Sequence, residues 1–108
     1  MGFIFGAKLS ALKKAGKLRV VVKDKAVLLV YFKNTVYGIK DACPHMKASL
    51  FKGTIEAGIV TCPRHGAKID VTTGAIQEKA KVLLLRVPTK HAQPVVTKVT
   101  DDDVFILV

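Results

Sequence analysis

Both cysteines of the chain and two of its three histidines occur in two short segments. Cys43 and His45 form a C-x-H pair, and after sixteen further residues Cys62 and His65 form a C-x-x-H pair. Thiolate and imidazole are common ligands of zinc and iron in proteins. A lone buried cysteine is often only a small apolar residue, but four such side chains in two turns indicate a metal site.

Two kinds of metal centre suit these four side chains. Zn²⁺ is bound tetrahedrally by two cysteines and two histidines, and its ligand turns usually have C-x₂₋₄-C and H-x₃₋₅-H spacing. Here each turn contributes one cysteine and one histidine. A two-iron, two-sulfur cluster with cysteines on one iron and histidines on the other uses that arrangement, because each turn can place one ligand on each iron. The spacing favours the cluster, and zinc remains the alternative.

The elements that must position these turns are short apolar runs separated by turn residues. Strands are expected at about 18–23, 26–32 and 35–39 before the ligand segment, and at about 75–78, 81–87, 94–99 and 104–108 after it. The turns between the first three strands are expected at Asp24-Lys25 and Lys33-Asn34. Closely spaced strands without a long helical period predict an all-β fold, a small antiparallel β-sandwich or barrel.

One short helix and one insertion interrupt this pattern. Residues 9–16 predict a helical turn with Ser10 as its N-terminal cap and Gly16 as its end. Residues 41–70 contain shorter apolar runs, three glycines and two prolines, which predicts a loop-rich insertion into the β scaffold. Loops on a rigid scaffold often carry function. The length of the chain predicts one domain, 1–108, with the ligand-bearing insertion at about 41–74.

Charge and composition restrict the partners. The 18 Lys and Arg residues exceed the 8 Asp and Glu residues, for a net charge of +10, which favours acidic partners. The cations do not interleave with aromatic residues, so we expect no nucleic-acid partner. No apolar run approaches the roughly twenty residues of a membrane span, and "MGFIF" is too short for a signal peptide. We therefore expect a cytoplasmic monomer without a membrane anchor, where reducing conditions favour metal binding by the two cysteines over a disulfide.

The stretches "CPHMKASL" (43–50) and "TCPRHGAKIDVTTG" (61–74) resemble the Rieske-type [2Fe–2S] domain, and in particular the small, stand-alone Rieske ferredoxins. The resemblance covers nearly the whole chain. It implies one cluster per chain, with Cys43 and Cys62 on the buried iron. It implies equally that His45 and His65 bind the iron near the surface.

Other positions of the same motif can be compared with the family. Gly66 matches the glycine that follows the second histidine, where a side chain is expected to crowd the cluster. Gly74 matches a hairpin turn in which it takes a positive φ. High-potential respiratory members have a Ser and a Tyr that donate hydrogen bonds to the cluster sulfurs, but this sequence has Ala67 and Ile69. The segment 75–82 also contains no proline, whereas many relatives have a Gly-Pro-rich cover.

The function implied by the resemblance is one-electron transfer rather than catalysis. The sequence shows no nucleophile–base pair or carboxylate dyad, and the chain is too short for the mononuclear iron domain of a Rieske oxygenase. We expect a carrier that takes electrons from a reductase to a terminal oxidoreductase, such as a ring-hydroxylating oxygenase. The alternatives are a small Rieske-like subunit of a larger reductase, of the nitrite reductase type, and a zinc-stabilised binding module.

Overall fold

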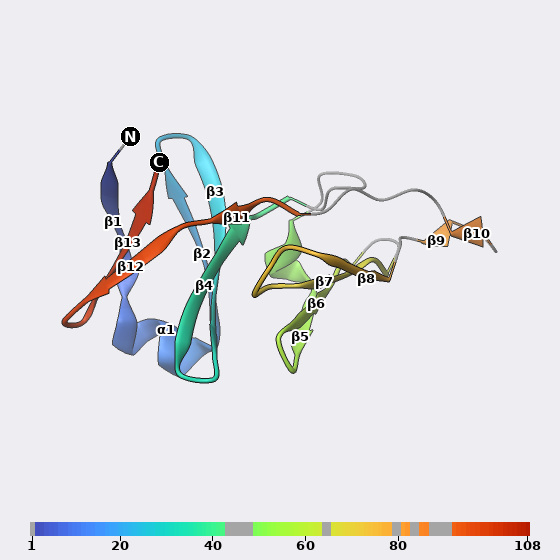
Figure 1. Cartoon of the computed structure of the whole chain (residues 1–108), viewed down its shortest axis with the longest axis horizontal. Coiled ribbons are helices and arrows are strands. Elements are labelled where there is room, and N and C mark those ends of the chain that lie inside the picture. The colour runs from blue at the N-terminus through green and yellow to red at the C-terminus, as the bar shows by residue number, and fades with distance from the viewer. Residues whose placement is uncertain (1, 43–48, 64–65, 79–80, 83–84, 87–91) are drawn as a thin grey trace.

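The structure, a computed structural model, describes residues 2–42, 49–63, 66–78, 81–82, 85–86 and 92–108. The molecule is elongated, with principal extents of 47 × 27 × 19 Å. A β-sandwich forms one end, and a smaller sheet lies beside it toward the other end (Figure 1). No helix in the described part of the chain is long and apolar enough to cross a membrane.

The sandwich consists of two antiparallel sheets. The first has the order β11-β4-β3-β2, with strands β2 (Lys17–Val22), β3 (Lys25–Phe32), β4 (Thr35–Lys40) and β11 (Pro94–Val95). The second has the order β1-β13-β12, with strands β1 (Phe3–Lys8), β12 (Thr97–Thr100) and β13 (Asp103–Leu107). The predicted all-β antiparallel fold is confirmed, although strand β1 was not predicted.

Strand β3 is buried on both faces, which explains its continuous apolar run. Successive side chains of a strand point to opposite faces. Val27 and Leu29 belong to the apolar cluster between the two sandwich sheets. Leu28 and Val30 belong to a second cluster, which also contains Cys62. The strand is therefore the wall shared by the sandwich core and the ligand-bearing part of the chain.

Two tight turns with positive φ join strands β2, β3 and β4. Lys33 and Asn34 have φ of 50° and 62°, which confirms the turn predicted there. The preceding turn is at Lys23 and Asp24, with φ of 48° and 63°, one residue before the predicted position. Two residues with positive φ match the right-handed twist of the flanking strands. The prediction erred because the apolar run begins only at position 26, whereas the pairing starts with Val22 and Lys25.

Helix α1 (Leu9–Ala15) ends, as predicted, at Gly16, which has φ 83°. Ser10 is not its N-terminal cap, because the helix begins one residue earlier and Ser10 lies in its first turn. The cap comes instead from Asp102, in the turn between β12 and β13. Its carbonyl oxygen accepts the Leu9 N–H at 2.7 Å, and its carboxylate accepts the N–H and the hydroxyl of Ser10 at 2.9 and 2.8 Å.

This cap predicts a pH-dependent contribution to stability. The hydrogen bonds from Ser10 lower the pKa of Asp102 below its ordinary value. A carboxylate whose pKa is lowered by folding stabilises the fold above its unfolded pKa, and that contribution is lost as the pH falls through its folded pKa. Asp102→Ala should lower the melting temperature by a few degrees at neutral pH. The difference in melting temperature from wild type should shrink at a pH below the ordinary pKa range of carboxylates. Asp101→Asn is the control, because asparagine tolerates the positive φ of 54° at that position. A difference that stays constant to pH 2 would contradict this assignment.

The insertion contains a sheet of its own. Strands β5 (Thr54–Glu56), β6 (Ile59–Thr61), β7 (Lys68–Asp70) and β8 (Ile76–Glu78) pair in chain order, after the 3₁₀ turn η1 (Leu50–Lys52). The predicted loop-rich segment, 41–70, thus contains three strands, each of which has three residues and is too short to show a periodic pattern. Strand β8 confirms the strand predicted at 75–78 and completes a four-stranded meander. The single strand predicted at 81–87 is also wrong, because β9 (Lys81–Val82) and β10 (Leu85–Arg86) pair with each other.

Candidate metal centre

The two ligand-bearing segments begin and end on different elements. The first runs from the end of β4 to η1 and contains Cys43 and His45, which lie outside the described residues. The second joins β6 to β7, and of its two predicted ligands Cys62 is described and His65 is not. The pairing of Thr54 with Thr61 places the chain that leaves the first segment beside the start of the second.

Cys62 is a buried thiol at one end of a closed turn. Its exposed fraction is 2%, and it belongs to the apolar cluster that includes Leu50 and Val60. Its N–H donates to the Ala67 carbonyl at 2.8 Å, and its carbonyl oxygen accepts the Gly66 N–H at 3.2 Å. Within the described part of the chain the thiol forms no disulfide. The chain that joins β6 to β7 therefore holds a thiol among apolar side chains, without a disulfide partner among the described residues.

The glycines of this region have identifiable roles. Gly66 has φ 73°, and a Cβ built there meets no described atom within 4 Å. The positive φ by itself favours glycine at this position, and the predicted crowding of the cluster by a side chain at 66 stays a prediction. Gly74 has φ 79°, as predicted, and a Cβ there would lie 2.5 Å from the Ala92 carbonyl oxygen. The hairpin turn at Gly74 is thereby held against the chain that leads into β11.

The chemistry of this wall fits an iron–sulfur cluster. Thiolate is the ligand that such clusters use, and the burial of Cys62 agrees with its implied place on the inner iron. Ala67 and Ile69 are fully buried and belong to the same apolar cluster of side chains as Cys62. The described residues contain no group of three or more His, Cys, Asp or Glu side chains that could hold a metal. The full ligand set stays a prediction, because Cys43, His45 and His65 lie outside them.

A residue that the sequence did not single out lies at the start of the first segment. Asp41 is the buried charged residue of the described part of the chain. Its carboxylate accepts hydrogen bonds from the side chains of Arg19 and Ser49 and from the N–H of Phe51. An aspartate two positions before a predicted cysteine ligand was a visible signal, but its burial depends on Arg19, which is distant in sequence.

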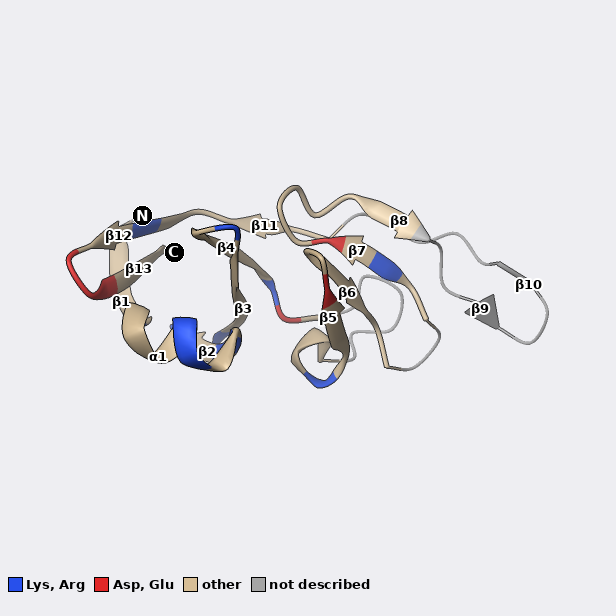
Figure 2. Ribbon diagram, turned by 90° about the horizontal axis from the view of Figure 1, so that it is seen from below, with Lys and Arg blue, Asp and Glu red and all other residues tan. Residues whose placement is uncertain are grey.

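Charged side chains surround this end of the molecule. Lys40 and Lys52 are exposed and Lys68 is half-buried, while the two cations within the ligand-bearing segments, Lys47 and Arg64, lie outside the described residues. Figure 2 shows one acidic position on strand β5 and one acidic and one basic position on β7. The acidic residues are Glu56 and Asp70, and the basic one is Lys68. One side of the Asp70 carboxylate is already engaged, because Oδ1 accepts the N–H and the hydroxyl of Thr72.

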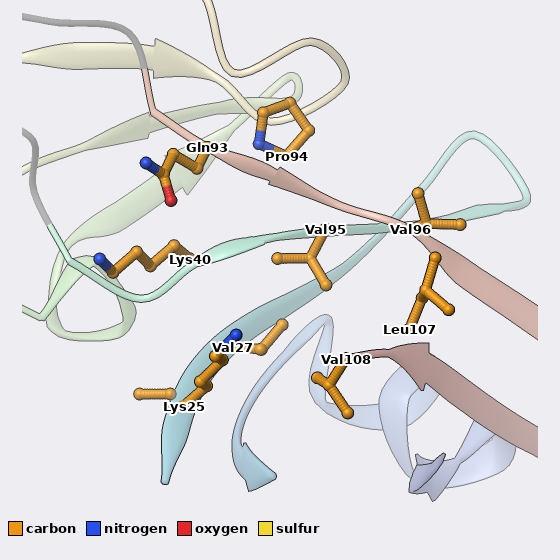
Figure 3. Close-up of a pocket in the computed structure, with 10 residues that line it drawn as sticks. Lys25, Val27, Lys40, Gln93, Pro94, Val95, Val96, Leu107 and Val108 are labelled. Atoms are coloured by element: carbon orange, nitrogen blue, oxygen red, sulfur yellow. The ribbon is translucent and has the colours of Figure 1, made fainter. Parts of the chain in front are cut away.

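A cleft of about 400 Å³ lies between the two sheets of the sandwich (Figure 3). Val27, Val95 and Leu107 form apolar parts of its lining, and Lys25 and Lys40 lie beside them. Cys62 does not line it.

Comparison with known proteins agrees with these features. The Rieske [2Fe-2S] domain family model matches residues 4–88. The anthranilate 1,2-dioxygenase ferredoxin subunit of Burkholderia cepacia is 32% identical over 72 residues, which are 62% of this chain and 67% of the relative. Apoptosis-inducing factor 3 of Mus musculus is 38% identical over 52 residues, 48% of this chain but 9% of that protein. The chain thus spans about a tenth of the length of this second relative.

Solved structures share the fold. The ferredoxin of carbazole 1,9a-dioxygenase from Nocardioides aromaticivorans IC177 superposes with a TM-score of 0.81 at 24% identity, covering 98% of this chain and 97% of that chain. The ferredoxin fold in a complex of reduced oxygenase and oxidized ferredoxin of carbazole 1,9a-dioxygenase gives 0.79 at 23% identity, covering 96% and 91%. The predicted cofactor, one [2Fe–2S] cluster, is confirmed by the family assignment. The chain belongs to the Rieske [2Fe–2S] domain family.

Proposed function

We propose that this protein is a one-electron carrier that passes electrons from a reductase to a terminal oxygenase of the ring-hydroxylating type. The observation that carries the proposal is the buried, free thiol of Cys62 at the β6–β7 hairpin of a chain in the Rieske family. Two relatives are ferredoxins of dioxygenases, and one structure contains an oxygenase together with a ferredoxin. These relationships favour an oxygenase as the electron acceptor.

The proposed ligands are Cys43 and Cys62 for the inner iron and His45 and His65 for the outer iron, within one domain, 1–108. When bound, the cluster supplies one-electron transfer, and its two neutral imidazole ligands make it easier to reduce than an all-thiolate cluster. The chain's own part is to hold the sulfur ligand in an apolar wall, as Cys62 is held. The chain must also leave the two proposed histidine ligands accessible to a partner protein.

Iron and sulfide analysis of the purified protein tests the proposal against its alternatives. Two irons and two acid-labile sulfides per chain, with reduction by a reductase and reoxidation by an oxygenase, support the carrier. A stable complex with a larger reductase, and no electron transfer to a separate acceptor, would favour the alternative that the protein is a small subunit of that reductase. A colourless protein with one zinc per chain would favour the binding module, and both of these outcomes would overturn the carrier.

The basic residues near the centre predict salt-dependent electron transfer. Lys40, Lys52 and Lys68 are described, and Lys47 and Arg64 are in the ligand-bearing segments themselves. If the partners are acidic, these cations should speed the encounter, and salt should slow it by screening. Lys52→Gln combined with Lys68→Gln should lower the second-order transfer rate at low salt by roughly two- to fivefold.

The matched control for this effect is Lys14→Gln combined with Lys23→Gln. Both are exposed lysines of the sandwich end, on α1 and in the β2–β3 turn. The control should retain the wild-type rate and most of its salt dependence in stopped-flow measurements. An equal decrease of the transfer rate in the two double variants would mean that only the overall charge matters. The proposal that the cations near the metal centre speed the encounter would then be wrong.

The absence of hydroxyl donors at two buried positions predicts a low reduction potential. Ala67 and Ile69 have no side-chain donor, and hydrogen bonds to cluster sulfur stabilise the added electron. Exposed cations raise the potential less, because solvent screens them. We expect a value around −150 mV, at the low end of the Rieske range. Ala67→Ser should raise it, whereas Ala75→Ser, in the β7–β8 turn, should not. Protein-film voltammetry measures both, and a wild-type potential well above zero would contradict the prediction.

A further inference from the structure

The environment of Asp41 is unusual for a carboxylate. Its side chain is completely buried, and burial of a charged group is costly unless the group is paired and hydrogen-bonded. Oδ2 accepts from Arg19 Nε at 2.8 Å and from Ser49 Oγ at 2.6 Å, and Oδ1 accepts from the Phe51 N–H at 2.8 Å. Both oxygens are therefore engaged, and the charge is balanced by Arg19.

These contacts join the two ends of the first ligand-bearing segment. Asp41 stands two residues before Cys43, and Ser49 is four residues after His45. The N–H of Asp41 also donates to the Ala26 carbonyl at 2.9 Å, which attaches the start of the segment to strand β3. One carboxylate thus fixes the spacing between the start and the end of the segment and holds both to the sandwich.

Strand β2 supplies a second attachment. Lys17 and Arg19 are two residues apart on β2, so their side chains lie on the same face of the strand. The Lys17 ammonium donates to the carbonyl oxygens of Phe51 and Gly53, the latter at 2.8 Å, and lies 4.7 Å from the centre of the Phe51 ring. The chain that follows Ser49 is therefore bound to β2 at Phe51, within η1, and at Gly53, directly after it.

The same segment leads directly to the second ligand-bearing turn. Gly53 packs so closely on Thr61 that a Cβ at position 53 would lie 2.0 Å from the Thr61 carbonyl oxygen. Thr61 precedes Cys62 in the chain. A continuous series of contacts therefore runs from Asp41 through η1 to the residue beside Cys62.

We propose that Asp41 is a positioning residue of the cluster: it holds the two ends of the first ligand-bearing segment at a fixed separation and, through η1, in register with Cys62. The inference rests on the proposed ligand set. An asparagine cannot replace the carboxylate fully, because its NH₂ group donates and cannot accept from Phe51 N–H, Ser49 or Arg19. Loss of one of these hydrogen bonds leaves a buried donor unpaired or displaces the end of the segment.

The test compares Asp41→Asn, Ser49→Ala and Asp103→Asn in the cluster-loaded protein. Asp103 also accepts a hydrogen bond from a cation, Lys8 at 2.7 Å, but it lies on β13 with 36% of its side chain exposed, and it serves as the matched control. Bleaching of the visible absorption by a chelator should be about tenfold faster in Asp41→Asn than in wild type. It should be about threefold faster in Ser49→Ala, which loses a single donor, and unchanged in Asp103→Asn. In the double variant Asp41→Asn/Ser49→Ala the bleaching rate should increase by less than the product of the two single factors, because both changes affect the same hydrogen bond between Ser49 and Asp41.

The electron paramagnetic resonance spectrum separates positioning from general stabilisation. The g-values of the reduced cluster should shift in Asp41→Asn and remain at wild-type values in Asp103→Asn. Faster bleaching with unchanged g-values, or bleaching at the wild-type rate in both Asp41→Asn and Ser49→Ala, would overturn the inference. If Asp41→Asn cannot be isolated with its cluster, Ser49→Ala decides the outcome. Wild-type protein without iron and sulfide would overturn the proposed function itself.

Discussion

Replacement of His65 by alanine should leave the protein without its cluster. The variant would offer the outer iron one imidazole in place of two, and the Rieske arrangement requires both. Visible absorption and the iron and sulfide content should fall to near zero, and His45→Ala should behave in the same way. We expect the β5–β8 sheet to persist nevertheless, because Leu50, Val60 and Ile69 are fully buried and belong to one apolar cluster. Circular dichroism measures that part of the result.

The third histidine provides the control for this experiment. His91 lies outside both ligand-bearing segments, so His91→Ala should retain the wild-type spectrum and two irons per chain. If His45→Ala and His65→Ala keep the native absorption and paramagnetic spectra, the assignment of the outer iron is wrong. Loss of the cluster in His91→Ala alone would point to a different ligand set.

Replacement of Gly53 by alanine should cause the largest loss of stability among the glycine variants. Gly53 has φ −81° and ψ −178°, an extended conformation that alanine adopts without strain. The cost is steric, because the new Cβ would lie 2.0 Å from the backbone oxygen of Thr61, which cannot rotate away. We expect the free energy of unfolding of the loaded protein to fall by about 3 kcal/mol. Denaturant titration followed by circular dichroism measures it.

Gly16→Ala provides the contrasting case. Gly16 has φ 83°, but a Cβ there meets no described atom within 4 Å, so its cost is conformational alone. That substitution should lower the free energy of unfolding by about 1 kcal/mol and should not change the rate of chelator bleaching. Gly53→Ala should also bleach faster, because Thr61 adjoins Cys62. Equal effects of the two substitutions would mean that the approach of Gly53 to Thr61 is not as tight as described.

The parts of the fold that could be predicted were those with strong local signals. The apolar run of β3, the turn at Lys33 and Asn34, and the end of α1 at Gly16 depend on neighbouring residues and on backbone preferences. The cofactor could be predicted because the cysteine and histidine motif that resembles the Rieske family is itself a local pattern. The strands of the insertion could not, since three-residue strands such as β5 and β6 have no period to detect.

Two of the errors and omissions involve contacts between residues distant in sequence. Ser10 resembled an N-terminal cap, but the accepting oxygens come from Asp102, at the far end of the chain. Asp41 resembled an ordinary loop aspartate, and only the fold brings Arg19 to it. In both cases the deciding partner is specified by topology and not by the local sequence. The run 81–87 is a different case, because β9 and β10 are neighbours in the chain and no Gly, Pro, Asn or Asp in the run indicates a turn between them.

The arrangement of the strands also has a consequence for the order of folding. The β5–β8 meander pairs only neighbours along the chain, whereas the sheet that closes the sandwich pairs Phe3 with Leu107. Closing a short loop costs less conformational entropy than closing a long one, so local pairings form sooner. We therefore expect the meander that carries Cys62 to form early and the β1–β13 pairing to form last. A ligand-bearing hairpin that precedes closure of the sandwich would be open to iron and sulfide donors while the rest of the chain is still folding.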